Sequence, residues 1–121
     1  DLEDSAVKEV AGLVRKLGLA GVIAANTTVS REGLMATVEQ VESYGAGGLS
    51  GPVLATRAKE VLMLLRKELG QQFAVISVGG VVNGDDVLER LKLGADLVQG
   101  YTGFVYQGPL WARKINASLP S

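Results

Sequence analysis

Three short apolar segments constrain what this chain can fold into more than any other feature of its sequence. They lie at residues 21–25, 73–78 and 95–99. Segments with apolar residues at helical spacing flank and separate them, at about 4–17, 54–69, 85–93 and 109–119. Strands that are apolar throughout are typical of a parallel sheet covered by helices. The sequence therefore predicts an α/β fold with the order αβαβαβα.

The spacing of these segments narrows the architecture further. The second predicted strand begins about 22 residues before the third, which leaves room for one strand, one helix and two short loops. This is the repeating unit of a (β/α)₈ barrel and also of a doubly wound sheet. Three strands cannot close a barrel. No domain boundary or internal repeat interrupts residues 1–121, so we expect them to belong to one domain.

Several helix ends carry recognisable signals. Asp4 or Ser5 is expected to cap the first helix, and Asn83 or Asp85 the third. Gly18 suits the end of the first helix, and Pro109 suits the first turn of the last one. Residues 26–52 are polar and rich in glycine, with at most one weak helix around residues 34–41. A loop of this length is expected to be a functional lid or disordered.

Composition excludes several kinds of chemistry. The 121 residues include no cysteine and no histidine, so a disulfide, a thiolate nucleophile, a zinc ribbon and a Ser-His-Asp triad are all impossible. The net charge of −1 argues against a dedicated nucleic-acid-binding protein, which is usually basic. No apolar run approaches the roughly 18 residues of a membrane span, and no signal peptide opens the chain. We expect no targeting or transmembrane segment within it, and no metal ligands.

The candidate site residues follow the predicted strands. In α/β folds, ligands bind at the carboxyl ends of the strands. Four clusters fall there or in the long loop: 26–28, 47–51, 79–80 and 101–103. Adjacent glycines let backbone N–H groups approach an anion closely, and barrels often bind phosphate after their last two strands, beside a short helix, here expected at 102–106. The alternative is that these glycines only form tight turns.

Asn26 and Thr27 are candidates for binding a ligand ring. The amide of Asn26 can both donate and accept hydrogen bonds, and Thr27 adds a hydroxyl. Together they suit a planar, polar heterocycle. The alternative is a local turn in which the Asn side chain bonds its own backbone. The segment 45–52 is expected to approach a ligand through its backbone, with a flexible hinge as the alternative.

The charged residues carry less information. Asp85, Asp86, Glu89 and Arg90 are expected to form the solvated surface of a helix, with the acidic pair near its N-terminus. Arg66 is expected to complement the C-terminal dipole of its helix, and Trp111 and Ile115 to pack in the core. No two carboxylates fall at strand ends, which argues against the acid–base chemistry of a glycosidase.

Four motifs in this order resemble the C-terminal part of the class 2, quinone-reducing dihydroorotate dehydrogenases. They are Ala-Ala-Asn-Thr-Thr-Val-Ser-Arg at 24–31, Gly-Gly-Leu-Ser-Gly-Pro at 47–52, Val-Gly-Gly-Val at 78–81 and Gly-Ala-Asp-Leu-Val-Gln-Gly-Tyr-Thr-Gly-Phe at 94–104. The resemblance implies an FMN-binding (β/α)₈ TIM barrel of which this chain holds strands six to eight. It also implies oxidation of dihydroorotate to orotate in pyrimidine (UMP) synthesis, with quinone as acceptor.

The resemblance also implies roles for individual residues. Ala25 would line the flavin, Gly51 and Gly80 would face FMN through their N–H groups, and Tyr101 and Thr102 would hold its phosphate. Asn26 and Thr27 would bind the orotate ring. The residues expected at the cofactor are Ala25, Ser50, Gly51, Gly79, Gly80, Tyr101 and Thr102.

Other parts of the family's machinery would lie outside this chain. The resemblance places the catalytic serine and a flavin-contacting lysine upstream, together with five strands and the helices that admit quinone. It implies a peripheral enzyme on the cytoplasmic side of a membrane. We therefore expect no catalytic residue here and no activity from the segment alone. Its two unpaired sheet edges would pair with the rest of the barrel or with another chain.

Two other functions stay open. One is a different FMN barrel, such as a class 1 dihydroorotate dehydrogenase or a dihydropyrimidine-oxidising relative. The other is a non-catalytic half-barrel with no more than a phosphate site.

Overall fold

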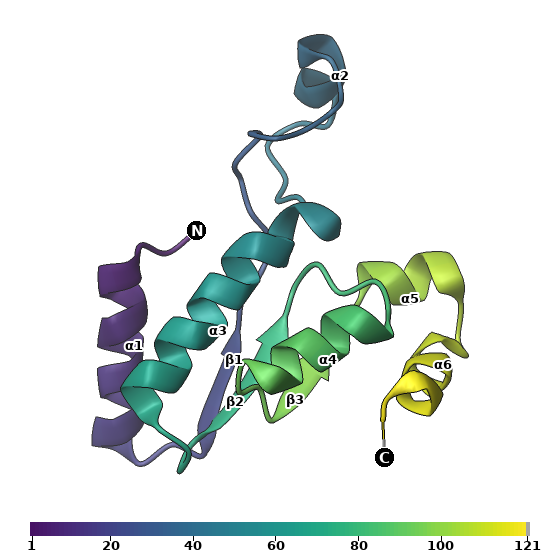
Figure 1. The fold of residues 1–121 in the computed structure, drawn as a ribbon. Helices are drawn as coiled ribbons and strands as arrows, with labels where there is room; N and C mark the ends of the chain where they lie inside the picture. The colour runs from purple at the N-terminus through teal and green to yellow at the C-terminus, as the bar shows by residue number, and fades with distance from the viewer. Residues whose placement is uncertain (121) are drawn as a thin grey trace.

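The computed structural model describes residues 1–120 and has the predicted order of helices and strands. Figure 1 shows the chain from α1 at the N-terminus to α6 at the C-terminus. The elements are α1 (Asp4–Leu17), β1 (Gly21–Ala24), α2 (Val38–Ser43), the 3₁₀ helix η1 (Pro52–Leu54), α3 (Ala55–Leu69), β2 (Ala74–Val78), α4 (Gly84–Lys92), β3 (Leu97–Gln99), α5 (Thr102–Gln107) and α6 (Trp111–Ser118).

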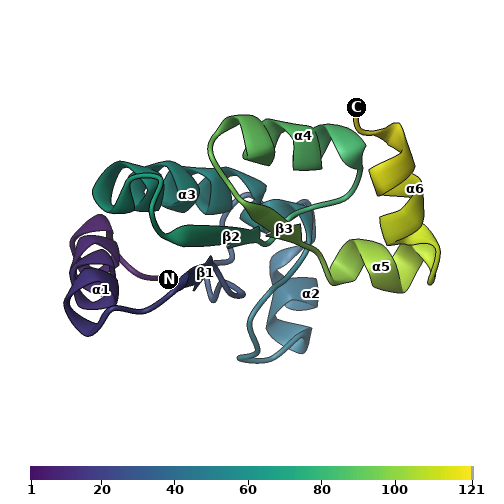
Figure 2. The same cartoon turned by 90° about the horizontal axis from the view of Figure 1, so that it is seen from below.

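The three strands form one parallel sheet in the order β1-β2-β3. Helices α3 and α4 lie along one face of this sheet in both views (Figures 1 and 2). The expected parallel α/β arrangement is therefore confirmed, and β1 and β3 form the two edges. The register places Ile23 beside Ile76 and Ile76 beside Leu97.

The core lies between this sheet and the helices that cover it. The main cluster joins α1, α3 and β2, and a smaller one joins the loop after β2 to α4 and α6. Trp111 and Ile115 are buried in the smaller cluster, as expected. The buried members of the main cluster are Val7, Ala11, Val14, Val61, Leu62, Leu65, Leu69, Val75 and Ala95.

Residues 21–24 form a partly exposed edge strand and not the buried strand that their apolar run predicts. Only β2 contains buried residues, while Ile23 is 57% exposed and Leu97 is 61% exposed. Side chains alternate between the faces of a strand, and Ile23, Ile76 and Leu97 share a row on the face away from the main cluster. In a closed barrel, such a row is part of the packed interior. Here the sheet has one covered face and two free edges.

Helix ends agree with their local signals in most places. Asn83 caps α4 through a capping box with Asp86, and Gly18 ends α1 in a left-handed conformation. Two expectations shift by a few residues: Glu3 occupies the N-cap of α1, and α6 begins at Trp111 rather than at 109. Within residues 1–120, no helix is both long enough and apolar enough to cross a bilayer.

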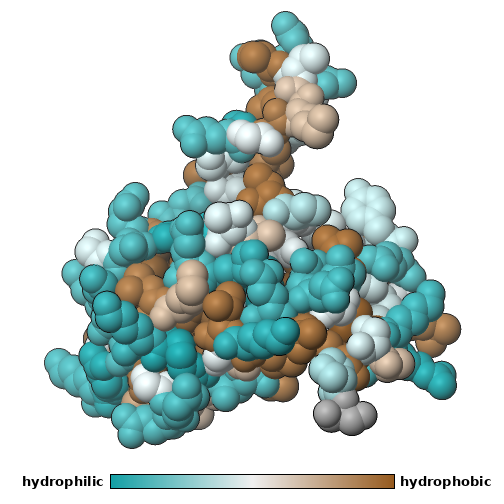
Figure 3. All heavy atoms as spheres, in the orientation of Figure 1, coloured by the Kyte–Doolittle hydropathy of each residue, from teal (hydrophilic) through white to brown (hydrophobic). Residues whose placement is uncertain are grey.

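Residues 29–48 form an arm that projects from the body of the molecule (Figure 1). Thr28 and Leu49 close its base with two backbone hydrogen bonds of 3.0 and 2.7 Å. Arg31 donates to the carbonyls of Gly45 and Gly47, and α2 lies at the outer end. The arm carries exposed apolar residues among hydrophilic ones (Figure 3), including Val29, Met35, Val38 and Tyr44.

Candidate functional site

The four predicted clusters converge on one cavity at the carboxyl ends of the strands. Its volume is about 210 Å³. All nine residues expected at the cofactor and the substrate line it: Ala25, Asn26, Thr27, Ser50, Gly51, Gly79, Gly80, Tyr101 and Thr102. These residues come from segments up to 77 positions apart (25 to 102). The parallel topology brings them together because it places the carboxyl ends of all three strands at the same end of the sheet.

Ser50 and Thr102 connect the long loop to the segment after β3. The Thr102 hydroxyl donates to Ser50 Oγ at 2.9 Å. Thr102 begins α5, the short helix that was expected at 102–106. The hydrogen bond fixes two hydroxyl groups on the same wall of the cavity.

Gly79 and Gly80 form the turn that follows β2. Both have positive φ angles, 106° and 73°, which side chains rarely adopt. A Cβ on Gly80 would lie 2.6 Å from the backbone nitrogen of Ala55. These glycines are therefore required by the turn and by its packing against the start of α3. They also line the cavity, so the two interpretations of the Gly-Gly pair are compatible.

Asn26 and Thr27 lie side by side after β1. The backbone N–H of Thr27 donates to Asn26 Oδ1 at 2.8 Å. The Asn26 side chain thus bonds the local backbone, as in the turn that is the alternative to ligand binding. Among residues 1–120, no hydrogen bond from Asn26 Nδ2 or from the Thr27 hydroxyl to a protein acceptor is present. Both donors remain for a ligand. Binding of a polar ring here stays a prediction.

Sequence reasoning missed other lining residues. Val78 and Val81 flank the glycine pair, Leu54 closes the cavity from η1, and Gly100 precedes Tyr101. No lining residue has a charged side chain. Polar contacts with a ligand would therefore come from hydroxyls, amides and backbone groups.

The expectation that Arg90 is part of a solvated surface is wrong. It is 1% exposed and donates to Ser77 Oγ and to the carbonyl of Gly79. Its position three residues after the buried Val87 was the available signal, because residues at this spacing share a helix face. Arg66 is also buried and donates to carbonyls and to Asp96 at the amino ends of the strands.

A larger groove of about 1030 Å³ borders β1 and lies against α1 and α3. Its lining includes Val22 and Ile23 of β1 and reaches the core residues Val7, Val61 and Leu65. Asn26 and Thr27 line it as well. This groove follows a free sheet edge and reaches down to core residues that are themselves buried.

Comparisons with known proteins identify the family of this chain. The family model for dihydroorotate dehydrogenase matches residues 1–121. A dihydroorotate dehydrogenase (quinone) from Clavibacter sepedonicus is 59% identical over 119 residues, which cover 98% of this chain and 35% of the relative. One from Rhodococcus opacus is 51% identical over the same length, which covers 33% of that relative. The chain thus spans about a third of these proteins.

Solved structures show the same fold. A crystal structure of ligand-free DHODH from Eimeria tenella has a TM-score of 0.86 and 32% sequence identity, and the match covers 97% of this chain and 32% of the other. The complex of that enzyme with ferulenol gives the same score and identity. The three strands and their helices are therefore part of a (β/α)₈ barrel and not of a doubly wound sheet.

Proposed function

The chain belongs to the dihydroorotate dehydrogenase family, and from this premise we propose that residues 1–121 are the C-terminal part of an FMN-binding barrel domain. The whole protein oxidises dihydroorotate to orotate in pyrimidine (UMP) biosynthesis and passes the electrons to quinone. The relatives named as quinone enzymes support this acceptor. The observation that carries the proposal is the convergence of all nine expected residues on one cavity.

The residues of this cavity fit FMN. The Gly79-Gly80 turn and Gly51 present backbone without side chains, and Ser50 and Thr102 present two joined hydroxyls. No acidic side chain in the lining opposes a phosphate. Tyr101 and Thr102 would hold the phosphate, and Ala25 would lie against the flavin ring. FMN, when bound, supplies the electron acceptor for the oxidation.

Asn26 and Thr27 would orient the substrate ring. Their side-chain donors lie at the end of β1, beside Ala25, so a ring held there would be next to the flavin position. An amide and a hydroxyl match the carbonyl and N–H groups of a dihydropyrimidine. These residues position the ring; the proton from the substrate goes to a serine outside residues 1–121.

The remaining strands would complete the barrel at the edges of this sheet. The groove along β1 reaches down to Val7, Val61 and Leu65 of the core, and a neighbouring strand would fill it. The quinone site and peripheral contact with a membrane belong to that remainder of the protein. The isolated segment is therefore inactive.

Titration of FMN into the flavin-stripped full-length protein tests this proposal. We expect saturable quenching of flavin fluorescence and quinone-dependent oxidation of dihydroorotate. Thr102→Val should weaken FMN binding by about tenfold, because it removes a hydroxyl that faces a charged group. Thr56→Val, on the exposed side of α3, is the matched control and should leave FMN affinity unchanged.

Three outcomes would contradict the proposal in different ways. Binding of inorganic phosphate without FMN would favour the non-catalytic half-barrel. Oxidation of dihydrouracil, or electron transfer to an acceptor other than quinone, would favour another FMN barrel. Turnover by the purified 121-residue chain would disprove the inactivity of the segment.

A further inference from the structure

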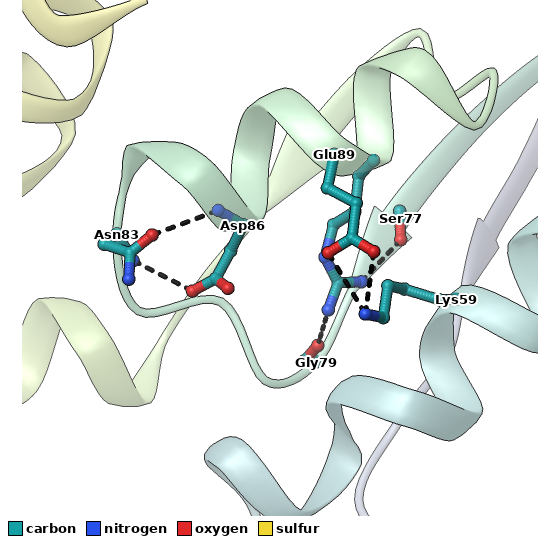
Figure 4. Close-up of polar contacts among 7 residues, drawn as sticks. Lys59, Ser77, Gly79, Asn83, Asp86 and Glu89 are labelled. Atoms are coloured by element: carbon teal, nitrogen blue, oxygen red, sulfur yellow. Dashed lines mark hydrogen bonds and ion pairs between the residues drawn. The ribbon is translucent and has the colours of Figure 1, made fainter.

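Arg90 holds the Gly79-Gly80 turn from the side of the sheet that the helices cover. Its guanidinium donates from Nη2 to the carbonyl of Gly79 at 2.6 Å and from Nη1 to Ser77 Oγ at 2.8 Å. Figure 4 shows both acceptors beside α4. Ser77 is fully buried and Arg90 is 1% exposed. The turn that lines the cavity is thus fixed by a cation in the protein interior.

This cation has no carboxylate partner. Within residues 1–120, no carboxylate oxygen lies within 4.0 Å of an Arg90 nitrogen. Glu89 pairs with Lys59, and Asp86 accepts from the backbone of Val82 and Asn83 (Figure 4). The Nε atom of Arg90 is buried without a hydrogen-bond partner in this part of the chain.

Keeping an unpaired charge inside a protein is costly. Burial lowers the pKa of Arg90, and the charges of Asp86 and Glu89 offset part of this effect; a guanidinium still remains protonated at neutral pH. An apolar side chain of similar size would fill the same space without that cost. The charge is therefore expected to meet a negative group that lies beyond the turn.

The geometry of the peptide unit shows how Arg90 acts on the cavity. In a trans peptide, the C=O and the following N–H point in opposite directions, and Ala24–Ala25 is the cis peptide bond of the described chain. Because the carbonyl of Gly79 points to Arg90, the N–H of Gly80 points away from α4. No backbone or side-chain acceptor in residues 1–120 takes this N–H.

We propose that Arg90 is a positioning residue for an anionic ligand group. It turns the Gly80 N–H toward the cavity and adds behind the turn a positive charge that no carboxylate contacts directly. This inference rests on the proposed function, in which the anionic group is the FMN phosphate. Arg90 does not line the cavity and acts through the turn.

Comparison of FMN with riboflavin tests this role, because the two differ by the phosphate. The full-length holoenzyme is stripped of its flavin, and dissociation constants for both flavins are measured by fluorescence quenching. Arg90→Met should weaken FMN binding at least tenfold and riboflavin binding less than threefold. Arg90→Lys keeps the charge but not both hydrogen bonds, and should weaken FMN binding about threefold.

Arg66→Met is the matched control. Arg66 is also a buried arginine that donates to backbone carbonyls, but its acceptors Gly94 and Phe73 precede the strands rather than follow them. This substitution should lower the thermal stability and leave the FMN-to-riboflavin affinity ratio of the folded protein unchanged.

The results separate this inference from the proposed function. Equal weakening of both flavins by Arg90→Met, or no weakening of either, would overturn the role of Arg90 while FMN binding by the wild type would keep the function. If Arg90→Met does not fold, an unchanged affinity ratio in Arg90→Lys would overturn it instead. Failure of the wild type to bind FMN would overturn the proposed function itself.

Discussion

At the scale of single residues, two buried arginines hold the two ends of the sheet. Arg90 bonds the turn after β2, and Arg66 bonds the carbonyls of Gly70, Phe73 and Gly94 in the loops before β2 and β3. Arg66 also forms an ion pair with Asp96. In a barrel, residues at the carboxyl ends of strands serve ligands, and residues at the opposite end serve stability. Substitution of the two arginines is expected to separate these roles.

Asp96 makes a pH-dependent contribution to stability. Hydrogen bonds from the Val75 N–H and the Arg66 guanidinium hold the pKa of Asp96 below its usual value. A carboxyl whose pKa is lowered in the folded state stabilises it above the unfolded pKa, about 3.9, and that stability is lost as the pH falls through the folded pKa. Asp96→Asn should therefore destabilise the full-length protein by about 1 kcal/mol at pH 7, since Asp96 is half exposed.

Chemical unfolding between pH 3 and pH 7 checks this prediction. The difference between wild type and Asp96→Asn should shrink as the pH falls below about 4. Glu42→Gln, on the exposed arm, is the matched control and should change the free energy of unfolding at pH 7 by less than about 0.5 kcal/mol. A difference that stayed constant over the whole range would contradict the assignment of this stability to the charge of Asp96.

At the scale of elements, two helices carry the same kind of cap but differ in what they bury. Both α2 and α4 begin with a capping box, Thr37 with Gln40 and Asn83 with Asp86. Helix α4 buries Val87 and Arg90, whereas α2 buries nothing. Because packing couples a helix to global unfolding, only the cap of α4 is expected to affect the stability of the whole domain.

Removal of each cap tests this difference. Asn83→Ala should lower the free energy of unfolding by about 1 kcal/mol. The free energy of opening measured by hydrogen exchange of the α4 amide protons should fall by a similar amount. Thr37→Ala should abolish protection in α2 and change the global value by less than about 0.5 kcal/mol. An equal global effect of both substitutions would show that the arm packs on the rest of the protein.

At the scale of the whole molecule, the sheet has an uncovered face and two unpaired edges. The row of Ile23, Ile76 and Leu97 lies on that face, and the groove along β1 reaches down to the core. In a complete barrel, closure would remove both edges and bury this row. The 121-residue chain by itself must cover these surfaces with another copy or leave them in water.

We therefore expect the isolated chain to self-associate. Sedimentation velocity should show species heavier than the 12.6 kDa of the monomer. Combined Ile23→Lys and Leu97→Lys substitutions should shift the distribution toward the monomer, because charges on the apolar row oppose association. Met35→Lys on the arm should not. A monomer at all concentrations would show that the exposed face does not drive association.

The sequence by itself determined the elements, their order and the residues that line the cavity. Helical periodicity, apolar strands and capping residues are local signals, so the helices and strands were predicted within a few residues. The nine candidate residues line one cavity because parallel strands have their carboxyl ends at the same end of the sheet, whatever the details of packing; their contacts with a ligand stay predictions. The four motifs and their order pointed to the family.

Only the tertiary structure decided which side chains are inside. Arg90 and Arg66 are charged residues on helices; the spacing of Arg90 from Val87 puts the two on one helix face, but a charge on that face is not enough to predict burial. They are buried because backbone carbonyls at the two ends of β2 accept their hydrogen bonds once the helices pack on the sheet. Ile23 and Leu97 are apolar but exposed because their strands lie at the edges of a one-sided sheet. Burial depends on neighbours that only the folded chain brings together.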